Sequence, residues 1–237
     1  MTFSYLIKIP RKRPILLPCV KSEKIKMKST KDEKFVWGGL HPFFYHPFIF
    51  HLIPDLKNKT VLDVGCGRGI YGYLIRATRP LAKGRLIGLD TNPDYLSFCS
   101  RFKVYDKLIK SDVRHLPFKD KSIDILLCTE VIEHLPKKEG KKFLNEINRV
   151  CRGRAIITTP NVFFKTVDAK FEDAHHSVWS ADEFRQYGYK VHGIGVRMPI
   201  GSYDKTFMLK QALSFLATPI SFIIPELSGY IICFKDY

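Results

Sequence analysis

VLDVGCGRG, residues 61–69, decides the fold of this 237-residue chain. Its opening letters are mostly apolar, which predicts a buried strand. Gly65, Gly67 and Gly69 then form a glycine-rich turn, and the sequence after them has helical spacing. The third glycine comes one residue earlier than in the dinucleotide fingerprint G-x-G-x-x-G, which disfavours a nicotinamide cofactor. Ordinary turns use the same residues, so the glycines need support from elsewhere in the chain.

Short apolar runs and helical stretches alternate along the rest of the chain. This alternation predicts right-handed crossovers and a doubly wound, Rossmann-like α/β sheet. The expected strands are residues 60–65, 85–90, 107–110, 122–129 and 154–159, followed by two closing strands at 189–196 and 229–234. The expected helices are residues 69–79, 93–102, 137–150 and 182–187, with Ser180 as the N-cap of the last one.

The composition predicts a single globular domain in a reducing compartment. Hydrophobic residues make up 45% of the chain and charged residues 26%, enough for a core without metal or disulfide staples. The six cysteines are scattered without a C-x-x-C pair, which argues against a zinc ribbon or a disulfide framework. With no signal-peptide pattern at the start, we expect a cytoplasmic protein.

A basic tail precedes the expected domain of residues 35–237. Residues 1–34 hold 10 Lys and Arg against three Asp and Glu, so seven of the 16 net positive charges lie there. We expect this tail to be flexible, and translation could equally start at Met27. The nine remaining charges favour anionic partners without identifying one, so a solvated basic surface and an RNA site both stay open.

Two apolar segments fall outside the alternating pattern. Residues 35–50 are rich in aromatics and contain His41 and His46, with His51 next. Histidines five apart do not share a helix face, so aromatic packing is expected there. Residues 199–227 form an apolar insertion, in which residues 207–225 are expected to loop between the closing strands. Its longest apolar run is too short for a membrane span of ~20 residues, leaving a pocket lid, a partner surface or a peripheral lipid contact.

Three aspartates mark the path of an elongated ligand at the carboxyl ends of the expected strands. Asp90 ends the second strand, where a carboxylate can accept hydrogen bonds from two ribose hydroxyls. Asp63 precedes the glycine turn, where its charge suits an ammonium or sulfonium group better than a pyrophosphate. Asp112 follows the third strand and can accept from an adenine amino group. Together they predict an adenosine-containing ligand with a positive charge.

The chain resembles the class I S-adenosylmethionine (SAM)-dependent methyltransferases, most closely their small-molecule group. The matching motifs are VLDVGCGRG, GLD (88–90), SDVRHLPF (111–118), IDILLCTEVIEHL (123–135) and RAIITTPN (154–161). The resemblance implies a seven-stranded sheet with an antiparallel last strand and SAM at the carboxyl ends of the strands. The implied cofactor-binding residues are Asp63, Gly65, Cys66, Gly67, Gly69, Asp90, Thr91, Asp112, Val113 and Glu130.

Carboxylates and histidines gather after the fourth and fifth expected strands. On one helical turn Glu130, Glu133 and His134 would share a side, and Asp173, His175 and His176 lie on a later loop at the same end of the sheet. One hypothesis is a divalent metal held by Glu130, Glu133, His134 and His175. The order of these motifs resembles metal-dependent small-RNA 2′-O-methyltransferases and, in its first part, ubiquinone-biosynthesis O-methyltransferases.

Without a metal, His134, His175 or His176 could accept the acceptor's proton. A purely structural role for the carboxylates and histidines also stays open. The expected activity is methyl transfer to oxygen or nitrogen of a small-molecule or lipid-like acceptor. The alternatives are metal-dependent 2′-O-methylation of RNA and a SAM-binding subunit without catalysis. The sequence leaves the oligomeric state open.

Overall fold

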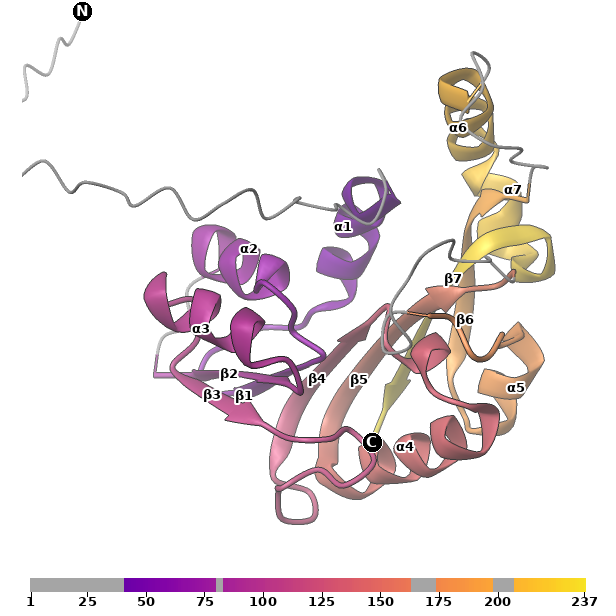
Figure 1. The fold of residues 1–237 in the computed structure, drawn as a ribbon. Coiled ribbons are helices and arrows are strands. Elements are labelled where there is room, and N and C mark those ends of the chain that lie inside the picture. The colour runs from indigo at the N-terminus through magenta and orange to yellow at the C-terminus, as the bar shows by residue number, and fades with distance from the viewer. Residues whose placement is uncertain (1–40, 80–82, 163–173, 198–206) are drawn as a thin grey trace, which may run out of the picture. The chain divides into compact units, whose positions relative to one another are not determined.

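A seven-stranded sheet in the order β3-β2-β1-β4-β5-β7-β6 forms the centre of the protein (Figure 1). The computed structural model describes residues 41–79, 83–162, 174–197 and 207–237; the expected basic tail lies outside them. The strands are β1 Thr60–Val64, β2 Arg85–Asp90, β3 Lys107–Lys110, β4 Ile123–Thr129, β5 Cys151–Pro160, β6 Lys190–Val196 and β7 Ser228–Asp236. β1 to β5 pair in parallel, and β7 runs antiparallel to both β5 and β6. The predicted α/β fold with its antiparallel last strand is confirmed.

Helices cover both faces of this sheet (Figure 1). They are α1 His41–Leu52, α2 Ile70–Thr78, α3 Pro93–Arg101, α4 Lys137–Val150, α5 Ala181–Gln186, α6 Phe207–Leu216 and α7 Thr218–Ile223, with short 3-10 turns η1 Ile132–His134 and η3 Pro225–Leu227. Ser180 caps α5 as expected, because its hydroxyl accepts from Glu183 N while the Glu183 side chain accepts from Ser180 N.

The core divides into two apolar clusters, one on each face of the sheet. Phe143 of α4 packs with Trp179 and Phe184 in one cluster. Ile49 of α1 and Ile75 of α2 belong to the other. β1 supplies residues to both clusters, which explains why its apolar residues do not alternate with polar ones. The five described cysteines are free and buried in these clusters or beside them.

The apolar segment 207–225 is helical, and the expectation of a loop there was wrong. α6 ends at Leu216, and α7 starts at Thr218 with Pro219 in its first turn, where a proline costs no hydrogen bond. α7 packs against the edge strand β6. Among the described residues, no helix combines the length and the hydropathy that a membrane crossing requires.

Candidate active site

The glycine turn after β1 lies directly against the segment after β4. Gly65 N and Cys66 N donate to Leu89 O at 2.8 and 3.0 Å, which holds the turn beside β2. Gly65 has a φ of +66°, and a Cβ on it would come within 2.3 Å of Val131 Cγ2. Only glycine therefore fits at this contact. The contact brings the glycine turn against the segment that carries Glu130 and Glu133.

Asp90 holds the open end of the turn. Its Oδ2 accepts from Gly67 N and its Oδ1 from Asn92 N, each at 2.8 Å. A Cβ placed on Gly67 would meet nothing within 4 Å, so the backbone faces open space there. Thr91 follows Asp90 and is exposed at the same strand end. The backbone of the turn is therefore open to close approach by a ligand.

Asp63 is buried beneath the turn and is only 1% exposed. Tyr105 donates its hydroxyl to Asp63 Oδ2 at 2.5 Å, whereas Oδ1 has no hydrogen-bond partner within the described part of the chain. Burial raises the pKa of Asp63 to about 7; the Tyr105 hydrogen bond opposes this shift and the charge of Asp90 adds to it. The carboxyl is thus only partly ionised at neutral pH, rather than a fixed negative charge.

Tyr105 fills the space between α2 and β2. A Cβ on Gly72 would lie 2.5 Å from the Tyr105 ring, and one on Gly88 would lie 2.8 Å from it. The Cys66 and Cys99 thiols lie nearby, both directed at Gly67 O, at 3.8 and 3.4 Å. Contact with Cys99, followed by burial, raises the pKa of the Cys66 thiol, which therefore stays protonated. Cys66 is a packing residue of the turn.

Asp112 and Val113 follow β3 at the same edge of the sheet. Asp112 accepts from Arg114 N at 2.8 Å and pairs with the Arg114 guanidinium at 2.5 Å. These bonds lower the pKa of Asp112, so its carboxylate is ionised at neutral pH. Val113 is buried in the core beside it. The position is compatible with the expected contact to a purine amino group.

Glu130 does not share a helical turn with Glu133 and His134, contrary to the expectation. η1 begins only at Ile132, and Glu130 has a left-handed φ of +56°. A non-glycine residue in this conformation costs energy and is often found at functional sites. Glu130 Oε1 accepts from the Thr158 hydroxyl at 2.9 Å, and burial raises the Glu130 pKa to about 7.

Glu133, His134 and His175 form a cluster whose ligand atoms all lie within 4.8 Å of one another. Glu130, also expected here, does not belong to it. Glu133 is 1% exposed; its Oε2 accepts from Thr159, and its Oε1 has no hydrogen-bond partner among the residues that the structure describes. Burial, and then the charge of Glu130, raises the pKa of Glu133.

The loop that carries His175 is tied to η1 through its backbone. His176 N and Ser177 N donate to Glu133 O at 2.8 and 3.0 Å. His134 Nδ1 lies 3.2 Å from Ala174 O, and the rings of His134 and His175 meet edge to face at 5.0 Å. The expected meeting of the two segments is therefore present, while Asp173 lies outside the described residues.

His175 has an electrically neutral side chain at pH 7. Burial, followed by the neighbouring His134 and His176, lowers the pKa of His175. A neutral imidazole can accept a proton or ligate a metal. The cluster therefore combines one carboxylate with two imidazoles, which suits first-row divalent metals.

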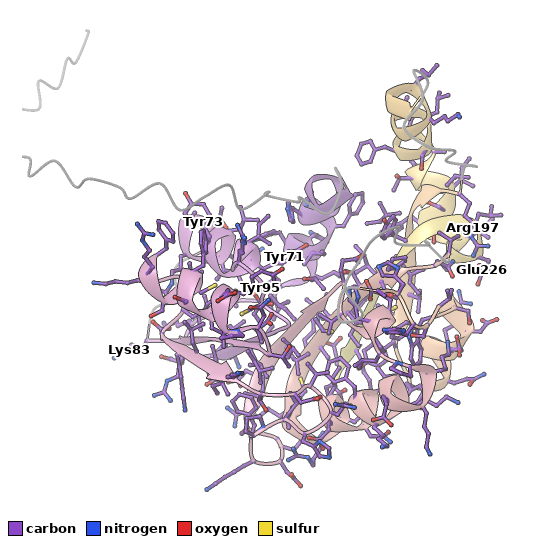
Figure 2. The ribbon with its side chains drawn as sticks, in the orientation of Figure 1. Tyr71, Tyr73, Lys83, Tyr95, Arg197 and Glu226 are labelled. Carbon is purple, nitrogen blue, oxygen red and sulfur yellow. The ribbon has the colours of Figure 1, made fainter. Side chains whose placement is uncertain are left out.

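His46 and Tyr71 also belong to this site, and sequence reasoning missed them. His46 Nδ1 lies 3.1 Å from the Tyr71 hydroxyl. Burial, followed by the charges of Glu130 and Asp63, raises the pKa of Tyr71, so its hydroxyl stays protonated. Tyr71 and the exposed Tyr73 lie on opposite faces of α2 (Figure 2). The one signal for His46 was its aromatic surroundings, which predicted packing and not a polar role.

Comparison with known proteins identifies the domain. The model of the methyltransferase domain family matches residues 62–158. An uncharacterised protein of Methanocaldococcus jannaschii is 32% identical over 59% of this chain and 60% of its own length. A fatty-acid O-methyltransferase of Mycolicibacterium smegmatis is 36% identical over 49% of this chain and 39% of its own length. This chain thus spans between about two fifths and three fifths of these two relatives.

Solved structures agree on the fold. A chain of the complex between the Haloferax volcanii Trm112 methyltransferase activator and a methyltransferase superposes with a TM-score of 0.58. The match covers 81% of this chain and 87% of that chain at 20% identity. The strand order, the glycine turn and these matches lead to one family. Residues 62–158 match the methyltransferase domain family, and the chain has the fold of the class I S-adenosylmethionine-dependent methyltransferases.

Proposed function

We propose that this protein transfers the methyl group of SAM to an oxygen or nitrogen atom of a small-molecule or lipid-like acceptor. The observation that carries the proposal is the position of the Glu133–His134–His175 cluster, two residues beyond the contact between Val131 and the glycine turn. Groups that can activate a nucleophile thus lie beside the cofactor turn. The methyltransferase relatives, one of them a fatty-acid O-methyltransferase, support the reaction and the acceptor class.

The residues of the turn fit SAM in shape and charge. In this proposal the open backbone at Gly67 leaves room for the ligand, Asp90 binds the ribose, and Asp63, whose Oδ1 has no partner among the described residues, binds the ammonium group. When bound, SAM supplies a methyl group on a positively charged sulfur. The chain then has to align the nucleophile with that methyl group and exclude water.

A divalent metal fits the Glu133–His134–His175 cluster. Glu133 Oε1, which has no hydrogen-bond partner among the described residues, is a ready ligand, and the imidazoles of His134 and His175 supply nitrogen donors. A metal held there would act as a Lewis acid toward a hydroxyl of the acceptor. Without one, His175 is the candidate general base. This donor set also supports a second candidate function, metal-dependent 2′-O-methylation of RNA.

One transfer experiment separates these functions. The full chain is incubated with methyl-labelled SAM and with separated lipid, small-molecule, protein and RNA fractions, with and without a chelator. Label in the lipid or small-molecule fraction is expected. Label confined to RNA and lost with chelator would replace the proposal by the RNA function, and label in no fraction would leave a SAM-binding subunit.

Binding of S-adenosylhomocysteine, which keeps the ammonium group of SAM, is expected to strengthen with pH. The Asp63 carboxyl is mostly protonated at pH 6 and mostly ionised at pH 8, since burial raises its pKa to about 7. An ammonium group selects the ionised form, so Kd should fall about tenfold from pH 6 to pH 8. Calorimetric titration measures this change. Asp63→Asn should remove the pH dependence and the exposed-site control Asp55→Asn should keep it; an unchanged slope in Asp63→Asn would contradict the assignment.

A further inference from the structure

Helices α6 and α7 expose apolar side chains and bury small polar ones, the reverse of what is expected for helices on a water-exposed surface. Leu209, Leu213 and Leu216 recur at helical spacing on one side of α6 and are 61%, 46% and 72% exposed. Ile220 and Ile223 of α7, and Ile224 directly after it, are 56%, 80% and 46% exposed. These six side chains are called the aliphatic surface below. Such a contiguous apolar patch marks an interaction site.

Small polar side chains take the inward side of the same helices. Ser214 donates its hydroxyl to Val196 O at 2.8 Å, and Thr218 accepts from Gly195 N at 3.2 Å. Thr218 and Ser221 are buried, at 5% and 0% exposure. The backbone of Ser221 lies so close to Gly193 that a Cβ on Gly193 would come within 2.3 Å of Ser221 O. The hydroxyls therefore fix α6 and α7 on β6 and leave the aliphatic side chains outside.

The charges around the aliphatic surface favour an anionic partner. α6 and α7 contain one lysine, Lys210, and no carboxylate. The neighbouring Glu226 pairs with Arg185 at 2.6 Å, and Arg185 also pairs with Asp182 at 2.7 Å. Arg197 directly follows β6 and lies near Glu226 in Figure 2; its backbone N donates to Leu227 O, and its guanidinium donates to Ser228 O and Asn161 O. The whole chain carries a formal charge of +16.

The composition of the surface distinguishes a lipid from a protein. The cores of protein interfaces are rich in Tyr, Trp, Phe, Met and Arg. The six residues of the aliphatic surface are all Leu and Ile and have no hydrogen-bonding side chain, and Phe215 beside them is less exposed, at 36%. A second copy of the chain would bring two strongly positive molecules face to face. A helix pair with an aliphatic face, cationic flanks and no carboxylate matches the interface plane of a membrane.

We propose that α6 and α7 dock the protein on the surface of an anionic lipid bilayer, with the aliphatic surface at the boundary of headgroups and acyl chains. β5 and β6 are both antiparallel to β7, so they run parallel to each other. α6 therefore comes after the carboxyl end of β6, at the same end of the sheet as the carboxylates that follow β4. Docking through α6 and α7 would turn the end of the sheet that holds the candidate active site toward the lipid. The inference goes beyond the proposed function and does not depend on the identity of the acceptor.

Flotation of the full chain with phosphatidylcholine–phosphatidylglycerol vesicles, without SAM, tests the docking. The protein is expected to float with the vesicles. The variant Leu216→Glu/Ile223→Glu should partition about 100-fold more weakly, since each substitution removes apolar contact worth about tenfold. The matched control Tyr73→Glu/Phe102→Glu changes two exposed side chains outside the surface and should float like the parent. All four positions are exposed, and melting curves check that each variant folds.

Three results would overturn the proposal. A parent protein that stays in the dense fraction does not bind the bilayer. A Leu216→Glu/Ile223→Glu variant that floats like the parent would assign the binding to another region, such as the basic residues 1–34. A parent dimer in light scattering that this variant dissociates would make the aliphatic surface an interface between copies.

Discussion

Replacing His175 by alanine is expected to lower the rate of methyl transfer about 10²–10⁴-fold, the range that a positioned proton acceptor contributes. The same loss follows if His175 holds a metal, because the cluster would then keep only Glu133 and His134. Binding of S-adenosylhomocysteine should stay within about threefold, since His175 lies on the loop tied to η1 and not on the glycine turn. Single-turnover transfer rates and calorimetry measure the two quantities.

Controls separate chemistry from folding. His51→Ala removes an exposed histidine of α1 and should leave the transfer rate unchanged. His176→Ala tests the adjacent imidazole in the same way as His175→Ala. If His175 is a base, adding metal should not change the residual rate of His175→Ala, and the parent's pH profile should show a pKa below the ordinary histidine value. Equal loss of transfer and cofactor binding in His175→Ala would mean that the loop is only structural.

Asp90→Ala is expected to weaken S-adenosylhomocysteine binding about 100-fold. The substitution removes the carboxylate placed for the ribose and also leaves Gly67 N and Asn92 N without their acceptor. A lost hydrogen bond to a charged group costs about 1.5–3 kcal/mol, so one such loss in binding accounts for roughly this factor. Calorimetry at pH 8, where Asp63 is mostly ionised, isolates the effect from that of Asp63.

Asp94→Ala provides the matched control. It removes an exposed carboxylate in the first turn of α3, close to the site but pointed at solvent, and should change affinity less than about twofold. Both variants should retain the circular dichroism spectrum of the parent. An affinity of Asp90→Ala within about threefold of the parent would exclude Asp90 from the cofactor site.

Sequence patterns predicted the sheet well because its central strands are buried on both faces. Apart from Asp63 and Asp124, the interiors of β1, β2 and β4 are apolar and buried, and such runs have few alternative structures. β5 begins three residues earlier than expected, because Arg152 and Arg154 give its start the polar composition of a surface segment. The Ser180 cap was predictable because Glu183 follows three residues later.

Features that depend on contacts distant in sequence could not be predicted. Glu130, Glu133 and His134 have the spacing of one helical turn, but the left-handed φ of Glu130 keeps this residue outside η1. The Tyr105 hydroxyl reaches Asp63 across 42 residues, and nothing local marks that bond. The leucines and isoleucines of α6 and α7 have the sequence pattern of a buried segment although they are exposed. The pattern alone therefore did not indicate which side of each helix faces solvent.

Tyr105 connects two glycines outside the proposed cofactor site to the pKa of Asp63, the residue proposed to bind the ammonium group of the cofactor. Gly72 and Gly88 leave no room for a Cβ beside the Tyr105 ring. In evolutionary terms, a lineage can acquire alanine at either glycine only after position 105 has become smaller. That prior change removes the hydroxyl that donates to Asp63 and so lets the pKa of this carboxyl rise further. Drift at a glycine of α2 would thereby retune the pH range in which the protein binds its methyl donor.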